Sequence, residues 1–103
     1  MNFYEAVKLA KANEHLIGKE YQTGIIDEII IVPTNEIEFD EYKRIYKRTH
    51  DAQKAIVPFM ESDVEVRLLI NKKLIGVYPP LFLHIRLHDL PPEYGAKLSL
   101  PKE

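Results

Sequence analysis

The sequence contains no cysteine, two serines and only four glycines. Without cysteine there is no disulfide, no thiolate zinc site, no iron–sulfur cluster and no cysteine nucleophile. The glycines are not clustered, which excludes a phosphate-cradling loop and a dinucleotide-binding fingerprint. Neither Ser62 nor Ser99 stands in the glycine-framed turn that a serine nucleophile requires. We therefore expect no bound cofactor and no enzyme of these classes.

The chain also lacks an excess of one charge and a long apolar run. Fourteen basic and sixteen acidic residues among 103 give a formal charge of −2, which removes the general electrostatic argument for a nucleic-acid partner. No stretch approaches the roughly 20 apolar residues of a membrane-spanning helix, and no signal peptide is evident. The sequence predicts one cytoplasmic domain over residues 1–103 that does not enter a membrane, with 91–103 as an extended tail.

Residues at the start of the chain have the spacing of an amphipathic helix. Asn2 stands three positions before Glu5, which is the capping-box spacing that satisfies two backbone amides at a helix start. Gly18 is expected to end this helical region. The apolar stripe expected to face the core is Phe3, Ala6, Val7 and Ala10.

A second helix is predicted over residues 36–56. Asn35 and Glu38 repeat the capping-box spacing, acidic residues precede basic ones as the helix dipole favours, and Pro58 ends the segment. The first residues also alternate between polar and apolar. A helix that begins only at Asp40, after a short strand, is therefore the alternative interpretation.

The remaining patterns are those of strands. Residues 25–32 are rich in β-branched side chains, and residues 20–22 are expected to pair with them in a short hairpin. Alternating or apolar runs predict three further strands at 64–70, 74–78 and 81–88. The predicted fold is α+β in the order α-β-α-β-β-β, with two helices packed on one face of a mainly antiparallel sheet.

The last predicted strand carries the surface that we consider most suited to a protein partner. On a strand, its polar residues share the outward face with one phenylalanine, and aromatic and arginine side chains dominate binding energy when an interface buries them. The residues predicted to bind a protein partner, or a second copy in a homodimer, are Phe82, His84, Arg86, His88, Tyr78 and Tyr94.

The two histidines of this strand do not predict a metal site. His84 and His88 are four residues apart, a spacing that places two imidazoles on one face of a helix. On a strand the same spacing separates them by roughly 13 Å, too far for one ion to bridge. An acid–base pair of either histidine with Asp89 or Glu28 is a further hypothesis, which sequence spacing alone does not support.

The alternative function is nucleic-acid binding by the basic face of the 36–56 helix. Its cations are suited to phosphate contacts and its tyrosines to base stacking. A solvated charged face explains the same pattern, since the tyrosines fall on the apolar stripe. The residues that would contact nucleic acid are Lys43, Arg44, Lys47 and Arg48. The leading hypothesis is a small, non-catalytic protein-binding module.

Overall fold

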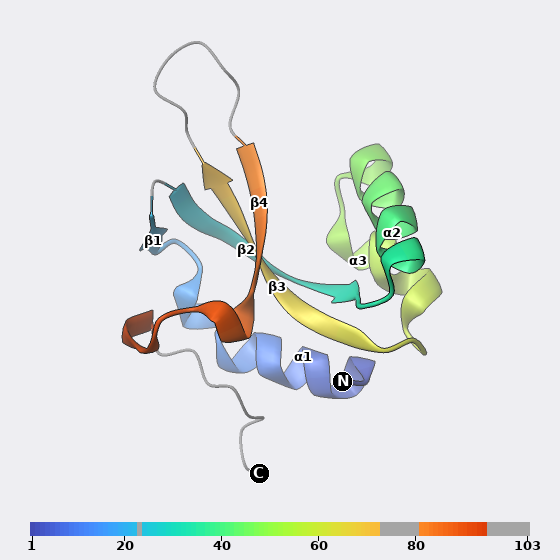
Figure 1. Ribbon diagram of the computed structural model, residues 1–103, viewed down its shortest axis with the longest axis horizontal. Helices are drawn as coiled ribbons and strands as arrows, with labels where there is room; N and C mark the ends of the chain where they lie inside the picture. The colour runs from blue at the N-terminus through green and yellow to red at the C-terminus, as the bar shows by residue number, and fades with distance from the viewer. Residues whose placement is uncertain (23, 73–80, 95–103) are drawn as a thin grey trace.

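The computed structural model describes residues 1–22, 24–72 and 81–94 (Figure 1). Four strands form one sheet in the order β1-β2-β3-β4, and every neighbouring pair is antiparallel. The α+β class, the antiparallel sheet and the predicted order of helices and strands are confirmed. The elements are α1 (Phe3–Ala12), η1 (Glu14–Leu16), β1 (Glu20–Tyr21), β2 (Gly24–Pro33), α2 (Glu36–Thr49), α3 (Ala52–Ile56), η2 (Val57–Phe59), β3 (Val64–Lys72), β4 (Leu81–Arg86), η3 (Leu87–Asp89) and η4 (Pro92–Tyr94).

The predicted capping box is present at the start of α1. The Asn2 side chain accepts a hydrogen bond from the Glu5 amide at 2.8 Å, and the Glu5 carboxylate accepts one from the Asn2 amide at 3.0 Å. The helix ends at Ala12 rather than near Gly18. Asn13 ends it, because its buried side-chain amide donates to the Leu9 carbonyl at 2.9 Å. Gly18 adopts a φ of 93° in the turn before β1.

The prediction of a single helix over residues 36–56 is wrong at its C-terminal end. The helix begins at Glu36 as expected, with the Asn35 side chain accepting from two amides of the first turn. It stops at Thr49 because His50 is left-handed, with a φ of 54°. The Asp51 carboxylate then accepts from the amides of Gln53 and Lys54 and starts the short helix α3 in a new direction.

The two central strands are longer than predicted, with β2 over Gly24–Pro33 and β3 over Val64–Lys72, and the two edge strands are shorter. The hairpin of β1 and β2 forms, but β1 contains only Glu20 and Tyr21. The last strand ends at Arg86 rather than at residue 88, because the chain turns into the 3₁₀ helix η3. The predicted strand at 74–78 lies outside the described residues.

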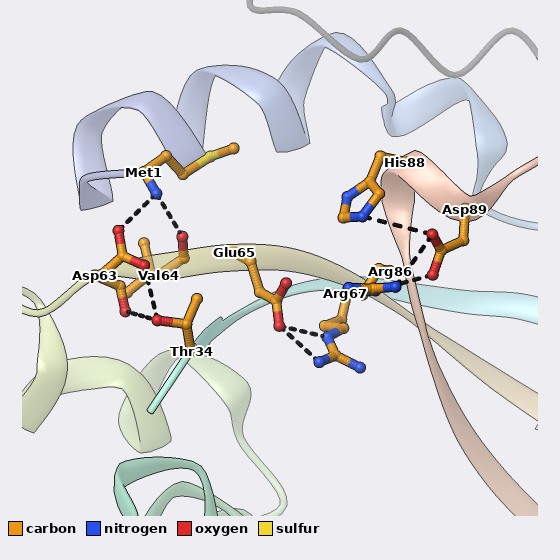
Figure 2. A network of polar contacts seen from close by, with 9 residues as sticks. All are labelled: Met1, Thr34, Asp63, Val64, Glu65, Arg67, Arg86, His88 and Asp89. Carbon is orange, nitrogen blue, oxygen red and sulfur yellow. Dashed lines mark hydrogen bonds and ion pairs between the residues drawn. The ribbon is translucent and has the colours of Figure 1, made fainter. Parts of the chain in front are cut away.

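The two long helices lie on opposite sides of the sheet, not on one face. Val64, Val66, Leu68 and Ile70 of β3 form a row that is at most 3% exposed. Helix α1 packs on β3, and Figure 2 shows α1 and α2 on opposite sides of this strand. Glu65 and Arg67 alternate with this row and point away from α1 (Figure 2). On that second side, the ring of Phe39 in α2 lies 5.6 Å from the Arg67 guanidinium. The strand periodicity separates the two rows but does not show which helix covers each.

The N-terminus is attached to the start of β3. The Met1 amine donates to the Asp63 carboxylate at 2.8 Å and to the Val64 carbonyl at 3.0 Å (Figure 2). The hydroxyl of Thr34 donates to the other carboxylate oxygen of Asp63 at 2.7 Å. These contacts hold α1 against the sheet. None of the helices in the described part of the chain is long and apolar enough to cross a membrane.

Candidate protein-binding groove

A groove of about 440 Å³ lies between α1, β2 and α3. One wall comes from α1 and the other from α3 and the turn that follows it. Val57 and Met60 remain 61% and 44% exposed on the second wall, although both are apolar. The apolar side chains of the two walls include Phe3, Val7, Ala10, Ile56, Val57 and Met60.

The floor of the groove is the outer edge of β2. The four successive residues from Glu28 to Ile31 all line the groove. Successive side chains of a strand point to opposite faces of the sheet. Because α1 packs on one side of the sheet and α3 lies with α2 on the other, a groove lined by both helices and by these four residues runs along the edge of the strand, with one wall on each face.

This edge presents backbone groups that no described residue pairs. β1 pairs only with Gly24 and Ile25. The next residue, Ile26, pairs with the segment that precedes β1. The Gly18 amide donates to the Ile26 carbonyl at 2.8 Å, and the Ile26 amide donates to the Lys19 carbonyl at 2.9 Å. Beyond Ile26, no described strand lies on the side of β2 opposite β3.

The register identifies which groups face the groove. Backbone groups of an antiparallel strand point alternately to its two neighbours. The Val64 amide donates to the Met1 carbonyl, on the side of β3 away from β2. The backbone N–H and C=O groups of all even-numbered residues of β3 therefore point away from β2. After the bulge between Ile26 and Glu28, Ile29 lies opposite Leu68 and Ile31 opposite Val66. The N–H and C=O groups of Ile29 and Ile31 therefore face the groove.

One end of the groove is acidic. Burial, followed by the nearby carboxylates of Asp27 and Asp51, raises the pKa of Glu28 above its usual range. Lys11 of α1 and Glu14 of η1 also line the groove, and their charges are opposite in sign. A negative potential around Glu28 remains, and it favours a positively charged group there.

A tyrosine lies beneath this acidic end. Tyr42 of α2 is fully buried, and its hydroxyl has no hydrogen-bond partner among the described residues. Burial raises its pKa, with smaller contributions from Tyr46 and Glu28, so the hydroxyl stays neutral. Its ring lies 6.2 Å from that of Phe39 and 6.3 Å from that of Tyr46. The residue therefore belongs to the core under α2.

We call the six residues predicted to bind a protein partner the β4 surface. The structure does not place all of them on one row of the sheet. His84 is half-buried, with its ring edge-on to Phe39 of α2 at 6.1 Å. Burial lowers its pKa, and the nearby cations Arg67 and Lys43 lower it further. His88 leaves the row because it lies in η3 beyond the end of the strand.

Arg86 and His88 both approach Asp89. The Arg86 guanidinium donates to its carboxylate at 2.9 Å, and His88 Nε2 lies 3.5 Å from it (Figure 2). In the part of the chain that the structure describes, no three His, Asp or Glu side chains are grouped to hold a metal ion. His84 packs on an aromatic ring rather than on Asp89 or Glu28, so the two histidines do not form one site.

The predicted aromatic members of this surface have different positions. Tyr94 packs edge-on against Tyr21 at 5.3 Å, and its hydroxyl donates to the Glu20 carbonyl at 2.9 Å. It therefore secures the end of η4 to β1. Tyr78 and the side chain of Phe82 lie outside the described residues. The predicted tail is described only as far as η4, because residues 95–103 are outside that range.

The basic face of α2 is exposed and partly neutralised by its own helix. Lys43 lies 3.3 Å from Asp40, and Arg44 pairs with Glu41. Lys43, Arg44 and Lys47 line a shallow depression of about 410 Å³ together with Asp40 and Ile37. The structure thus brings together three of the four predicted cations.

The sequence did not reveal the groove, because its walls and floor come from three separated segments. Two local signals point toward it. Val57 and Met60 are apolar at the end of a helical segment, and two acidic residues interrupt the isoleucine run of β2. No family model matches the chain, and comparison with curated proteins and with solved structures gives no significant match.

Proposed function

We propose that this chain is a non-catalytic protein-binding module, and that its partner binds in the groove between α1, β2 and α3. The observation that carries this proposal is an apolar groove whose floor is an open strand edge. Burial of apolar surface is the main source of affinity between proteins. An uncovered strand edge is a site where other chains pair, and most proteins block such edges.

The β4 surface is less suited to this role than the sequence suggests. His84 and Tyr94 are already in contact with aromatic side chains of the same chain, and Arg86 is already paired with Asp89. Exposed side chains that must first leave an internal partner contribute less to binding. We therefore retain a protein as the partner and place its binding site in the groove rather than on β4.

A library of displayed random twelve-residue peptides tests this function. We expect peptides selected on the chain to lose binding when Val57→Asp places a charge on the wall of the groove. Ile37→Asp is the matched control, because Ile37 is 80% exposed on α2 and does not line the groove. Selected peptides that bind both variants equally would show that the groove is not the binding site.

Nucleic-acid binding by the basic face of α2 is the second candidate. Lys43, Arg44 and Lys47 share one depression, which suits several phosphate contacts. Fluorescence anisotropy with labelled single-stranded RNA and DNA at low salt tests it. Binding that falls steeply with salt and is lost in Lys43→Glu/Lys47→Glu would favour this function over the first. No binding at low salt would exclude it, because phosphate contacts are strongest there.

A further inference from the structure

The walls of the groove restrict the amino-acid sequence of any segment that pairs with β2. An added strand would lie about 4.8 Å from β2 and hydrogen-bond to Ile29 and Ile31. Its side chains would then point alternately toward α1 and toward α3. They would meet Val7 and Ala10 on one side and Val57 on the other, and all three are apolar. A strand covered on both faces needs apolar residues at consecutive positions, not only at alternate ones.

The charge of the groove adds a second requirement. Glu28 lines the groove and directly follows Asp27 in β2, while the other charged lining residues, Lys11 and Glu14, have opposite signs. The raised pKa of Glu28, caused by burial and then by Asp27 and Asp51, agrees with an excess of negative charge at this end. A lysine or arginine next to the apolar run would lie in the negative potential at this end. An acidic residue there would be repelled. Charge complementarity of this kind mainly selects between partners.

A second copy of the chain fits this groove poorly. The edge of β2 lies between walls that include Val7 and Lys11 on one side and Gln53 and Val57 on the other. In a second copy, the corresponding edge would be recessed between the same walls. The walls of the two copies would therefore meet before the two edges reached hydrogen-bonding distance. A bare extended segment has no such walls.

We infer that the groove binds a short extended segment of another protein by strand addition to β2. The segment is apolar over about three residues and carries a lysine or arginine beside them. This inference rests on the proposed function and specifies the class of partner. Main-chain hydrogen bonds to Ile29 and Ile31 supply affinity, and the side chains in contact with the two walls supply selectivity.

The probe is the acetylated and amidated peptide Lys-Thr-Val-Ile-Val-Thr-Lys, added to the full chain and followed by isothermal titration calorimetry. Two analogues carry N-methyl groups, one on both valines and the other on the central isoleucine. Only one alternating set of peptide amides faces a neighbouring strand. We expect one analogue to bind about tenfold or more weakly, because it has lost backbone hydrogen bonds, while the other retains most of the affinity.

A third peptide with glutamate in place of both lysines tests the charge requirement. We expect it to bind about threefold or more weakly, and Glu28→Gln to reduce this difference. The Val57→Asp variant should not bind the parent peptide, whereas Ile37→Asp should. Light scattering on the chain alone reports whether a second copy occupies the groove, and we expect a monomer.

Each other outcome overturns the inference in a different way. If both methylated analogues bind as well as the parent, a peptide occupies the groove without forming a strand, and the proposed function survives alone. If no peptide binds and the chain is a dimer that Val57→Asp dissociates, the occupant is a second copy. If the chain is a monomer and the parent peptide does not bind, strand addition by an apolar basic segment is wrong. The displayed library then decides the proposed function separately.

Discussion

Removing the hydroxyl of Tyr42 should stabilise the protein. This side chain is fully buried under α2, and its hydroxyl has no hydrogen-bond partner among the described residues. A buried polar group without a partner costs about 1–3 kcal/mol relative to water. Tyr42→Phe removes that group and keeps the ring, which is held between Phe39 and Tyr46.

The expected change in the free energy of unfolding is therefore an increase of about 1–3 kcal/mol. For a domain of this size each kcal/mol corresponds to roughly 4–8 °C in the melting temperature. Urea denaturation at pH 7 and 25 °C measures the free energy, and thermal denaturation followed by circular dichroism provides a second value. The slope of the urea transition should not change, because the variant buries nearly the same surface.

Tyr46→Phe is the matched control. Tyr46 lies on the same helix one turn later and is only half-buried, so loss of its hydroxyl should change the free energy of unfolding by less than about 0.5 kcal/mol. A Tyr42→Phe variant that is less stable than the parent would show that the hydroxyl has a partner. The assignment of Tyr42 to an unpaired position in the core would then be wrong.

Three further variants test other parts of the structure. Burial and two nearby cations lower the pKa of His84 in the folded protein below its ordinary value of 6.5, so the unfolded chain binds this proton more tightly. The free energy of unfolding should therefore decrease as the pH falls below 6.5, and this decrease should be smaller in His84→Asn. Asn2→Ala removes a capping box and should lower the free energy of unfolding by about 1 kcal/mol in urea denaturation. Asp63→Asn removes the exposed ion pair with Met1 and should cost less than about 1 kcal/mol, with a smaller effect at 0.5 M salt than at 0.05 M salt.

Specific results would contradict these expectations. If the free energy of unfolding of His84→Asn decreases with falling pH as steeply as that of the parent, a group other than His84 causes the pH dependence. An Asn2→Ala variant as stable as the parent would mean that the capping box does not contribute. A salt-independent loss in Asp63→Asn would attribute the effect to the hydrogen bond with Thr34 rather than to the ion pair.

The sequence predicts features that depend on neighbouring residues. The sequence predicts the caps at Asn2 and Asn35 because a cap and the amides that donate to it lie within three positions of one another. The sequence also predicts β2, because the isoleucines of this strand favour the pleated conformation. At these positions the local preference of the sequence and the observed helix starts and strand agree.

The sequence fails where the decisive contact is distant or the backbone is unusual. The helical pattern of residues 36–56 continues through His50, but that residue is left-handed and ends α2. Histidine adopts this conformation only occasionally, so spacing alone does not reveal the break. His84 was expected to face solvent because it alternates with apolar residues, yet α2 covers that face of the sheet through Phe39.

The groove also depends on the length of β1, and the pattern of polar and apolar residues does not predict that length. A strand of two residues leaves most of the outer edge of β2 without a neighbour among the described residues. A longer β1 would cover Ile29 and Ile31 and close the floor of the groove. The candidate site is therefore a property of how α1, β2 and α3 meet, not of a motif.

The central claim is that the edge of β2 at Ile29 and Ile31 is open and accepts another chain. Amide hydrogen exchange of the full chain, measured by NMR with and without the peptide Lys-Thr-Val-Ile-Val-Thr-Lys, tests it directly. The amides of Ile29 and Ile31 should exchange much faster than that of Ile30, which points to β3, and the peptide should slow both. Strong protection of Ile29 and Ile31 before peptide is added would contradict the account, because the edge would already be paired.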